Sequence, residues 1–158
     1  MKKTLFTSVL LLLVSLGFAQ SNKEEVDLVQ SIFGIEKKAM AAEFITLDAT
    51  QKDAFWLAYD EYETKRKELG KKRIDLLNKY AASYTTMDDA TADDIVNQTI
   101  SLQAETDKLV NTYYKKIKKS CGVKPAAQFY QLESYVLSEI RAAIMENIPL
   151  IGALDKNK

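Results

Sequence analysis

The side chains that most enzymes use for acid–base chemistry are scarce in this chain of 158 residues. It contains no histidine, so the side chain that titrates near neutral pH and most often binds metals is missing. Its single cysteine, Cys121, has no histidine to activate it, and the sequence has no glycine-rich phosphate-binding loop. We therefore expect a binding protein and not an enzyme, with no metal and no cofactor.

Three pairs of adjacent carboxylates lie near predicted helix starts, and helix capping explains them. Acids at helix starts accept hydrogen bonds from free backbone N–H groups and interact favourably with the helix dipole. Their spacing forms no general acid–base pair, and a metal site would need further ligands from elsewhere in the chain. These acids are Glu24, Glu25, Asp88, Asp89, Asp93 and Asp94.

The densest local charge is basic, with six cations in the nine residues from Lys65 to Arg73. One interpretation is a solvated helix face, because Glu61 and Glu63 lie one turn before Lys65 and Lys67. The other is a binding face that mixes charged and aromatic side chains. Such a face can hold acidic and apolar segments of many partners without demanding one shape.

Helical phase favours the binding face, because Arg66 and Arg73 fall in register with the apolar stripe of the same segment. Cations thus interrupt the stripe instead of opposing it. We predict that a partner binds through the residues that share this face or flank it, with the only tryptophan as a further partner or dimer contact. These residues are Trp56, Tyr62, Lys65, Arg66, Leu69 and Arg73.

The first 19 residues have the pattern of a cleaved secretory signal: Lys2 and Lys3, an apolar run at 5–16, then small residues ending at Ala19. The run is shorter than the roughly 18 apolar residues of a membrane span, so we expect no stable membrane insertion after cleavage. We expect a periplasmic mature chain, residues 20–158, in which 20 bases face 22 acids. This balance disfavours a nucleic-acid partner.

The elements that position these residues are predicted to be helices. Apolar residues recur every three or four positions between sparse glycines and prolines, which predicts four helices and no sheet, in one all-α domain. We expect them at about 23–44, 48–83, 88 or 91 to 119, and from Pro125 toward Pro149, with residues 150–154 as a strap over the bundle. In an oxidising compartment the lone Cys121 is buried, free, or linked to a second chain.

Caps are predicted for the two longest helices. Asp48 can cap the second helix while Gln51 reaches back, as in a capping box. Either Asp88 or Thr91 can cap the third, and Gly122 suits the left-handed position after it. Helices of this length leave much surface uncovered in one compact chain, which predicts either an elongated hairpin bundle or a dimer.

Leu47, Asp48 and Gln51 resemble the LTxxQ motif of the Spy/CpxP-like periplasmic chaperones, with Asp48 in place of the threonine. Both residues are good N-caps, so the physical role of the position survives the exchange. A second, degenerate start follows near the C-terminus at residues 123–128, with Lys124 in place of the threonine and Gln128 one place late. The resemblance implies a cradle-shaped, all-helical homodimer that holds partly unfolded proteins without ATP.

Two other functions stay open. Some relatives regulate envelope stress signalling, so the partner could be one membrane sensor or anti-sigma protein instead of many clients. The chain could also be a structural helical module without clients. A metal-sensing branch of the family uses histidine ligands, which this chain lacks.

Overall fold

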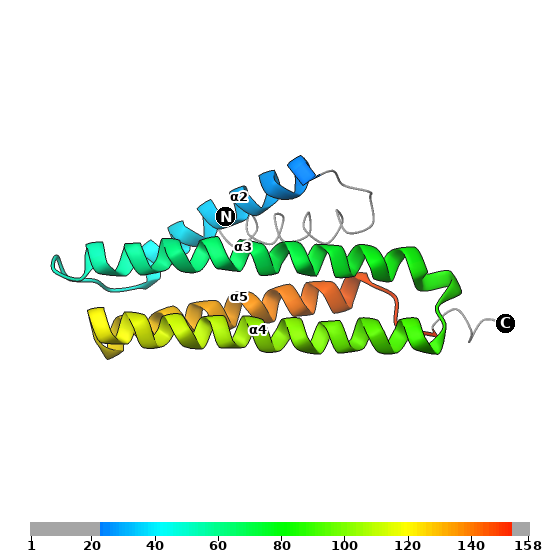
Figure 1. Cartoon of the computed structure of the whole chain (residues 1–158). Coiled ribbons are helices and arrows are strands. Elements are labelled where there is room, and N and C mark those ends of the chain that lie inside the picture. The colour runs from blue at the N-terminus through cyan, green and yellow to red at the C-terminus, as the bar shows by residue number, and fades with distance from the viewer. Residues whose placement is uncertain (1–22, 153–158) are drawn as a thin grey trace.

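The computed structural model of the chain describes residues 23–152, and this part is an elongated helical bundle (Figure 1). It contains four α-helices, α2 (Lys23–Phe44), α3 (Lys52–Ser83), α4 (Asp89–Cys121) and α5 (Val123–Asn147), and a short 3₁₀ turn, η1 (Tyr84–Thr86). The predicted all-α fold with two long helices is therefore confirmed. At 1.5 Å per residue, α3 and α4 each extend about 50 Å. The predicted signal, residues 1–19, lies outside the described residues.

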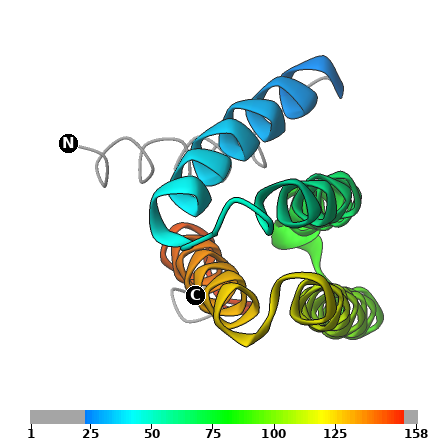
Figure 2. The ribbon, with the colours of Figure 1, turned by 90° about the vertical axis from the view of Figure 1, so that its left-hand side faces the viewer.

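Helix α4 runs antiparallel to α3 and α5, which run in the same direction, and the three helices form a triangle when viewed from one end (Figures 1 and 2). Helix α2 crosses the side of the triangle formed by α3 and α5, and it packs against both. The Lys23 end of α2 diverges from α3 (Figure 1). Between residues 23 and 152, no helix combines the length and the apolarity needed to cross a membrane.

The core is aromatic and lies toward the end where α3 begins. The ring of Tyr62 lies 5.5 Å from that of Tyr113 and 5.1 Å from that of Phe129, both in edge-to-face orientation. Such pairs stabilise a core beyond the area that they bury. Phe55 and Tyr59 extend the same cluster and are fully buried.

The helix ends follow the predicted caps closely. Asp48 Oδ1 accepts a hydrogen bond from Gln51 N at 3.0 Å, and Gln51 Oε1 accepts one from Asp48 N at 3.0 Å, which completes a capping box. A turn occupies residues 49–51, so α3 itself begins at Lys52, four residues after the predicted start. Asp88, and not Thr91, caps α4 by accepting from Thr91 N at 2.8 Å. Gly122 ends α4 with φ +89°, a left-handed value that favours glycine.

After α5 the chain crosses the end of the bundle at the place of the predicted strap, residues 150–154, but Leu150 is 64% and Ile151 49% exposed, so this strap is only partly packed against the helices. The hydroxyl of Tyr80 donates to Pro149 O at 2.5 Å, and that of Tyr84 donates to Leu150 O at 3.2 Å. Two tyrosines at the end of α3 therefore hold the segment that follows α5. The strap is described as far as Gly152.

Candidate functional site

The six residues predicted to bind a partner do not share one open face. Lys65 is exposed, and Trp56, Leu69 and Arg73 are partly exposed. Tyr62 is fully buried between α4, α5 and Lys37 of α2, and the side chain of Arg66 is 12% exposed because α2 covers it. The periodicity of α3 alone could not show that α2 would cover it. A binding role for these residues stays a prediction.

Beneath α2 lies a buried ionic network. Lys37 of α2 is fully buried and ion-pairs with Glu63 of α3 and, at 2.9 Å, with Glu133 of α5. Tyr62 donates its hydroxyl proton to Glu133 Oε2 at 2.6 Å, and Arg66 Nε donates to Glu63 Oε2 at 3.0 Å. Two cations thus face two carboxylates, and Lys37 joins three helices.

The tyrosines of the network are held in their protonated form. Burial raises the pKa of Tyr62, and the charge of Glu133 raises it further. Burial and the charge of Glu63 likewise raise the pKa of Tyr59. The nitrogen of Lys37 lies 4.8 Å from the centre of the Tyr62 ring, within the range of a cation–π contact. The arrangement is chemically suited to anchoring α2.

An open cleft lies at the opposite end of the bundle, between α3, α4, α5 and the strap. Its volume is about 570 Å³, a size typical of clefts that hold small molecules. Its lining is mostly aliphatic, and much of its rim is exposed, with Met145 at 59% and Leu150 at 64%. Aliphatic residues of the lining include Leu76, Ile95, Ile144, Met145, Leu150 and Ile151.

Two arginines interrupt the apolar lining, Arg73 from α3 and Arg141 from α5. Arg141 Nη2 lies 3.3 Å from Asp107 Oδ1, whereas no carboxylate between residues 23 and 152 pairs with Arg73. Burial lowers the pKa of Arg73, as do the neighbouring guanidinium groups of Arg141 and Arg66. A guanidinium nevertheless stays charged in proteins, so Arg73 offers an unpaired positive charge to the cleft.

Comparison of the chain with protein-family models, curated proteins and solved structures finds no match. The resemblance to the Spy/CpxP-like chaperones therefore stays a prediction that rests on Leu47, Asp48, Gln51 and the helical layout. The cleft is the feature of the structure from which a function can be inferred.

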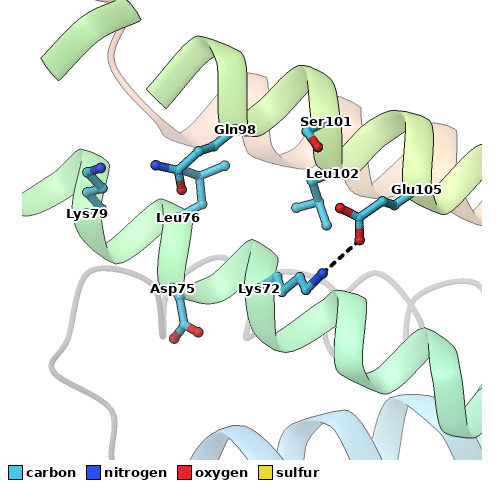
Figure 3. Close-up of a pocket in the computed structure, with 8 residues that line it drawn as sticks. All are labelled: Lys72, Asp75, Leu76, Lys79, Gln98, Ser101, Leu102 and Glu105. Atoms are coloured by element: carbon cyan, nitrogen blue, oxygen red, sulfur yellow. Dashed lines mark hydrogen bonds and ion pairs between the residues drawn. The ribbon is translucent and has the colours of Figure 1, made fainter. Parts of the chain in front are cut away.

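A second hollow, of about 390 Å³, lies between α3 and α4 and differs from the cleft in its charge (Figure 3). Lys72 and Glu105 point toward each other across it, 2.7 Å apart, while Asp75 points away from α4. The hydrogen bond from Lys72 lowers the pKa of Glu105. Lys79 pairs with Asp94 at the same hollow. Because its charges neutralise one another in pairs, this hollow is a weaker candidate for a ligand.

The two glutamines of the motif-like segments act as structural ties. Gln51 Nε2 donates to Cys121 O at 2.8 Å, and the thiol of Cys121 donates to Gln51 O at 3.7 Å. Gln128 donates to Phe44 O and accepts from Thr46 N, both at 3.0 Å. Gln51 thus joins the turn before α3 to the end of α4, and Gln128 joins α5 to the segment between α2 and α3. Cys121 is 3% exposed, so burial is the alternative that the structure supports.

Sequence reasoning missed Lys37, Glu133 and Arg141. Lys37 follows Phe33 by four residues, and Glu133 follows Phe129 by four, so each stands inside the apolar stripe of its own helix. A charged residue inside such a stripe is a signal of a buried pair. Within residues 23–152, no group of three or more acids and cysteines gathers as a metal site would require.

Proposed function

We propose that the chain is an exported, ATP-independent holding protein that binds partly unfolded proteins at the cleft between α3, α4 and α5. The cleft supports this function because it combines exposed aliphatic side chains with the charge of Arg73, which pairs with no carboxylate that the structure describes. Large exposed apolar patches mark sites where other molecules bind. Met145 at the rim is flexible and polarisable, which suits contacts with clients of different shape.

Contacts of this kind are expected to be weak and quickly reversible. Apolar side chains of a client enter the cleft while its backbone stays in water, so no single sequence is required. Arg73 adds attraction for acidic segments, and salt screens that attraction because the cleft is open to solvent. Such holding needs no nucleotide.

Export and the family resemblance support the proposal independently of the cleft. The N-terminal pattern predicts secretion, and the capping box of Asp48 and Gln51 preserves the physical role of the LTxxQ motif. A homodimer is part of the same proposal, since the resemblance implies one.

The test is aggregation of a reduced, denatured model protein with stoichiometric mature chain, without ATP and at low and high salt. We expect suppression that weakens with salt. Arg73→Glu is expected to weaken client binding by about tenfold, since charged contacts each contribute on the order of 1.5–3 kcal/mol. A glutamate there pairs with Arg141, so the fold should persist, which circular dichroism checks.

Lys52→Glu is the matched control, because Lys52 is an exposed cation on the same helix, outside the cleft and outside the predicted partner-binding residues. Suppression by this variant should equal that of the unmodified chain. The proposal fails if the unmodified chain suppresses no aggregation at either salt concentration, or if Lys52→Glu abolishes suppression while Arg73→Glu leaves it intact.

A further inference from the structure

We propose that the same cleft binds a single-chain amphiphile with an anionic head, of which a long-chain fatty acid is the simplest example. This inference does not depend on the proposed function, because the ligand is a small molecule whose binding is measured without any client protein. It rests on the polarity of the cleft along its length.

The two arginines and the only glutamine of the cleft lining gather at the end of the cleft nearer the middle of the bundle, its inner end. Arg73 of α3, Gln103 of α4 and Arg141 of α5 line that end, whereas Tyr80 and Ile95 lie about two turns farther along. Because α4 runs antiparallel to α3 and α5, a rising residue number on α3 and α5 and a falling one on α4 all lead from the cationic end toward the strap (Figure 1). The cleft therefore passes from a cationic end to an apolar end over about 10 Å of helix.

The cationic end is suited to a carboxylate. The two guanidinium groups come from different helices and lie close enough for the charge of Arg141 to lower the pKa of Arg73. An anion between them relieves this repulsion, and a guanidinium binds a carboxylate through two parallel hydrogen bonds. Arg141 already shares Asp107, so Arg73 supplies the charge that remains to be neutralised.

The apolar end is suited to an acyl chain more than to an extended peptide. A peptide would bring backbone N–H and C=O groups that need partners when buried. The hydroxyls of Tyr80 and Tyr84 at this end already donate to the strap. An acyl chain has no such groups, and Ile144, Met145 and Ile151 offer it apolar contact.

The experiment is calorimetric titration of the mature chain, stripped of bound lipid, with dodecanoate below its micelle-forming concentration. Butyrate, which keeps the carboxylate but has a short tail, tests whether binding needs the long acyl tail. Dodecyltrimethylammonium, which keeps the tail but has a cationic head, tests whether binding needs the anionic head. We expect dodecanoate to bind one to one, and both other probes to bind at least about tenfold more weakly. Equal binding of dodecanoate and dodecyltrimethylammonium would overturn the proposal, because it would show apolar adsorption without recognition of the head.

Arg73→Gln is expected to weaken dodecanoate binding by about tenfold or more, and the exposed control Lys52→Gln by less than about twofold. Met145→Glu places a charge beside the apolar tail at an exposed position, so it should weaken binding without harm to the fold. Unchanged affinity in both cleft variants would overturn the proposal.

Two other occupants of the cleft are tested alongside. If dodecanoate binds only after deletion of residues 153–158, the C-terminal segment of the chain fills the cleft. If dodecanoate binds only while a dimer of the protein dissociates, a second copy of the chain fills the cleft. Either result would overturn the assignment to an anionic amphiphile, whereas one-to-one binding to the full mature chain without a change in its mass would support it.

Discussion

Lys37 is the residue on which the position of α2 depends most. It is fully buried, and its ammonium group pairs with carboxylates from two other helices, Glu63 and Glu133. Buried charges are stable only when paired, and removal of one partner leaves the others without compensation. Lys37 therefore fixes the position of α2 against α3 and α5 more specifically than its apolar neighbours do.

Lys37→Met should lower the free energy of unfolding by about 3–5 kcal/mol, because Glu63 and Glu133 lose their shared cation in the interior. The neighbouring Lys38→Met is the matched control. Lys38 pairs with Asp60 at 2.5 Å, with both side chains about half exposed, so its loss should cost at most about 1 kcal/mol. Urea denaturation measures both, and a smaller loss for Lys37→Met than for Lys38→Met would contradict the role of the network.

Asp48 and Asp88 should make stability fall in acid. The hydrogen bond from the Thr50 side chain lowers the pKa of Asp48 in the folded chain, and that from Thr91 lowers the pKa of Asp88. Their contribution is complete above the ordinary aspartate pKa of about 3.9 and is lost as pH falls through the lowered folded value. The double variant Asp48→Asn, Asp88→Asn should flatten this acid limb in thermal melts between about pH 5 and pH 2. If stability falls in acid as steeply in the double variant as in the unmodified chain, groups other than Asp48 and Asp88 cause the loss.

At the scale of elements, the two turns at one end of the bundle are tied by glutamine side chains. Gln51 reaches the last residue of α4, and Gln128 reaches back to the end of α2 and to Thr46. Each tie satisfies backbone groups that a helix end leaves without partners. The ties therefore fix where α3 and α5 begin relative to each other.

Gln51→Ala and Gln128→Ala should each lower the free energy of unfolding by about 1–2 kcal/mol, because each leaves backbone groups without their partners. Gln131→Ala is the control, since Gln131 is exposed on the same helix as Gln128 and should change stability by less than about 0.5 kcal/mol. Hydrogen exchange should also quicken at residues 44–51 in the first two variants only. Equal rates of hydrogen exchange at residues 44–51 in all three variants would show that the two glutamine ties are dispensable.

The sequence predicted the elements better than their contacts. The range 23–44 for the first helix, the capping box at Asp48 and the break at Gly122 are confirmed because local hydrogen bonds and backbone freedom determine them. The surroundings of Tyr62 and Arg66 could not be predicted, because they depend on the docking of α2 across α3. The cleft likewise requires α3, α4, α5 and the strap together, so only Arg73 of its polar residues was singled out.

At the scale of the whole molecule, the two ends of the bundle differ in packing. The end with the capping box has the aromatic core, the buried network and both glutamine ties. The other end has an open cleft and exposed aliphatic side chains. A well-packed end that supports an end with an open apolar cleft suits a protein that holds varied ligands. The homodimer expected from the family resemblance stays a prediction.

The most direct test of the central claim, that clients bind at the cleft, is site-specific photo-crosslinking. A photoreactive residue replaces either Met145, 59% exposed at the cleft rim, or Leu57, 65% exposed near the start of α3. Both positions are apolar and similarly accessible, so they differ mainly in location. With an unfolding client we expect crosslinks from position 145 and few from position 57. Equal crosslinking at both positions, or crosslinking chiefly from position 57, would contradict the assignment of client binding to the cleft.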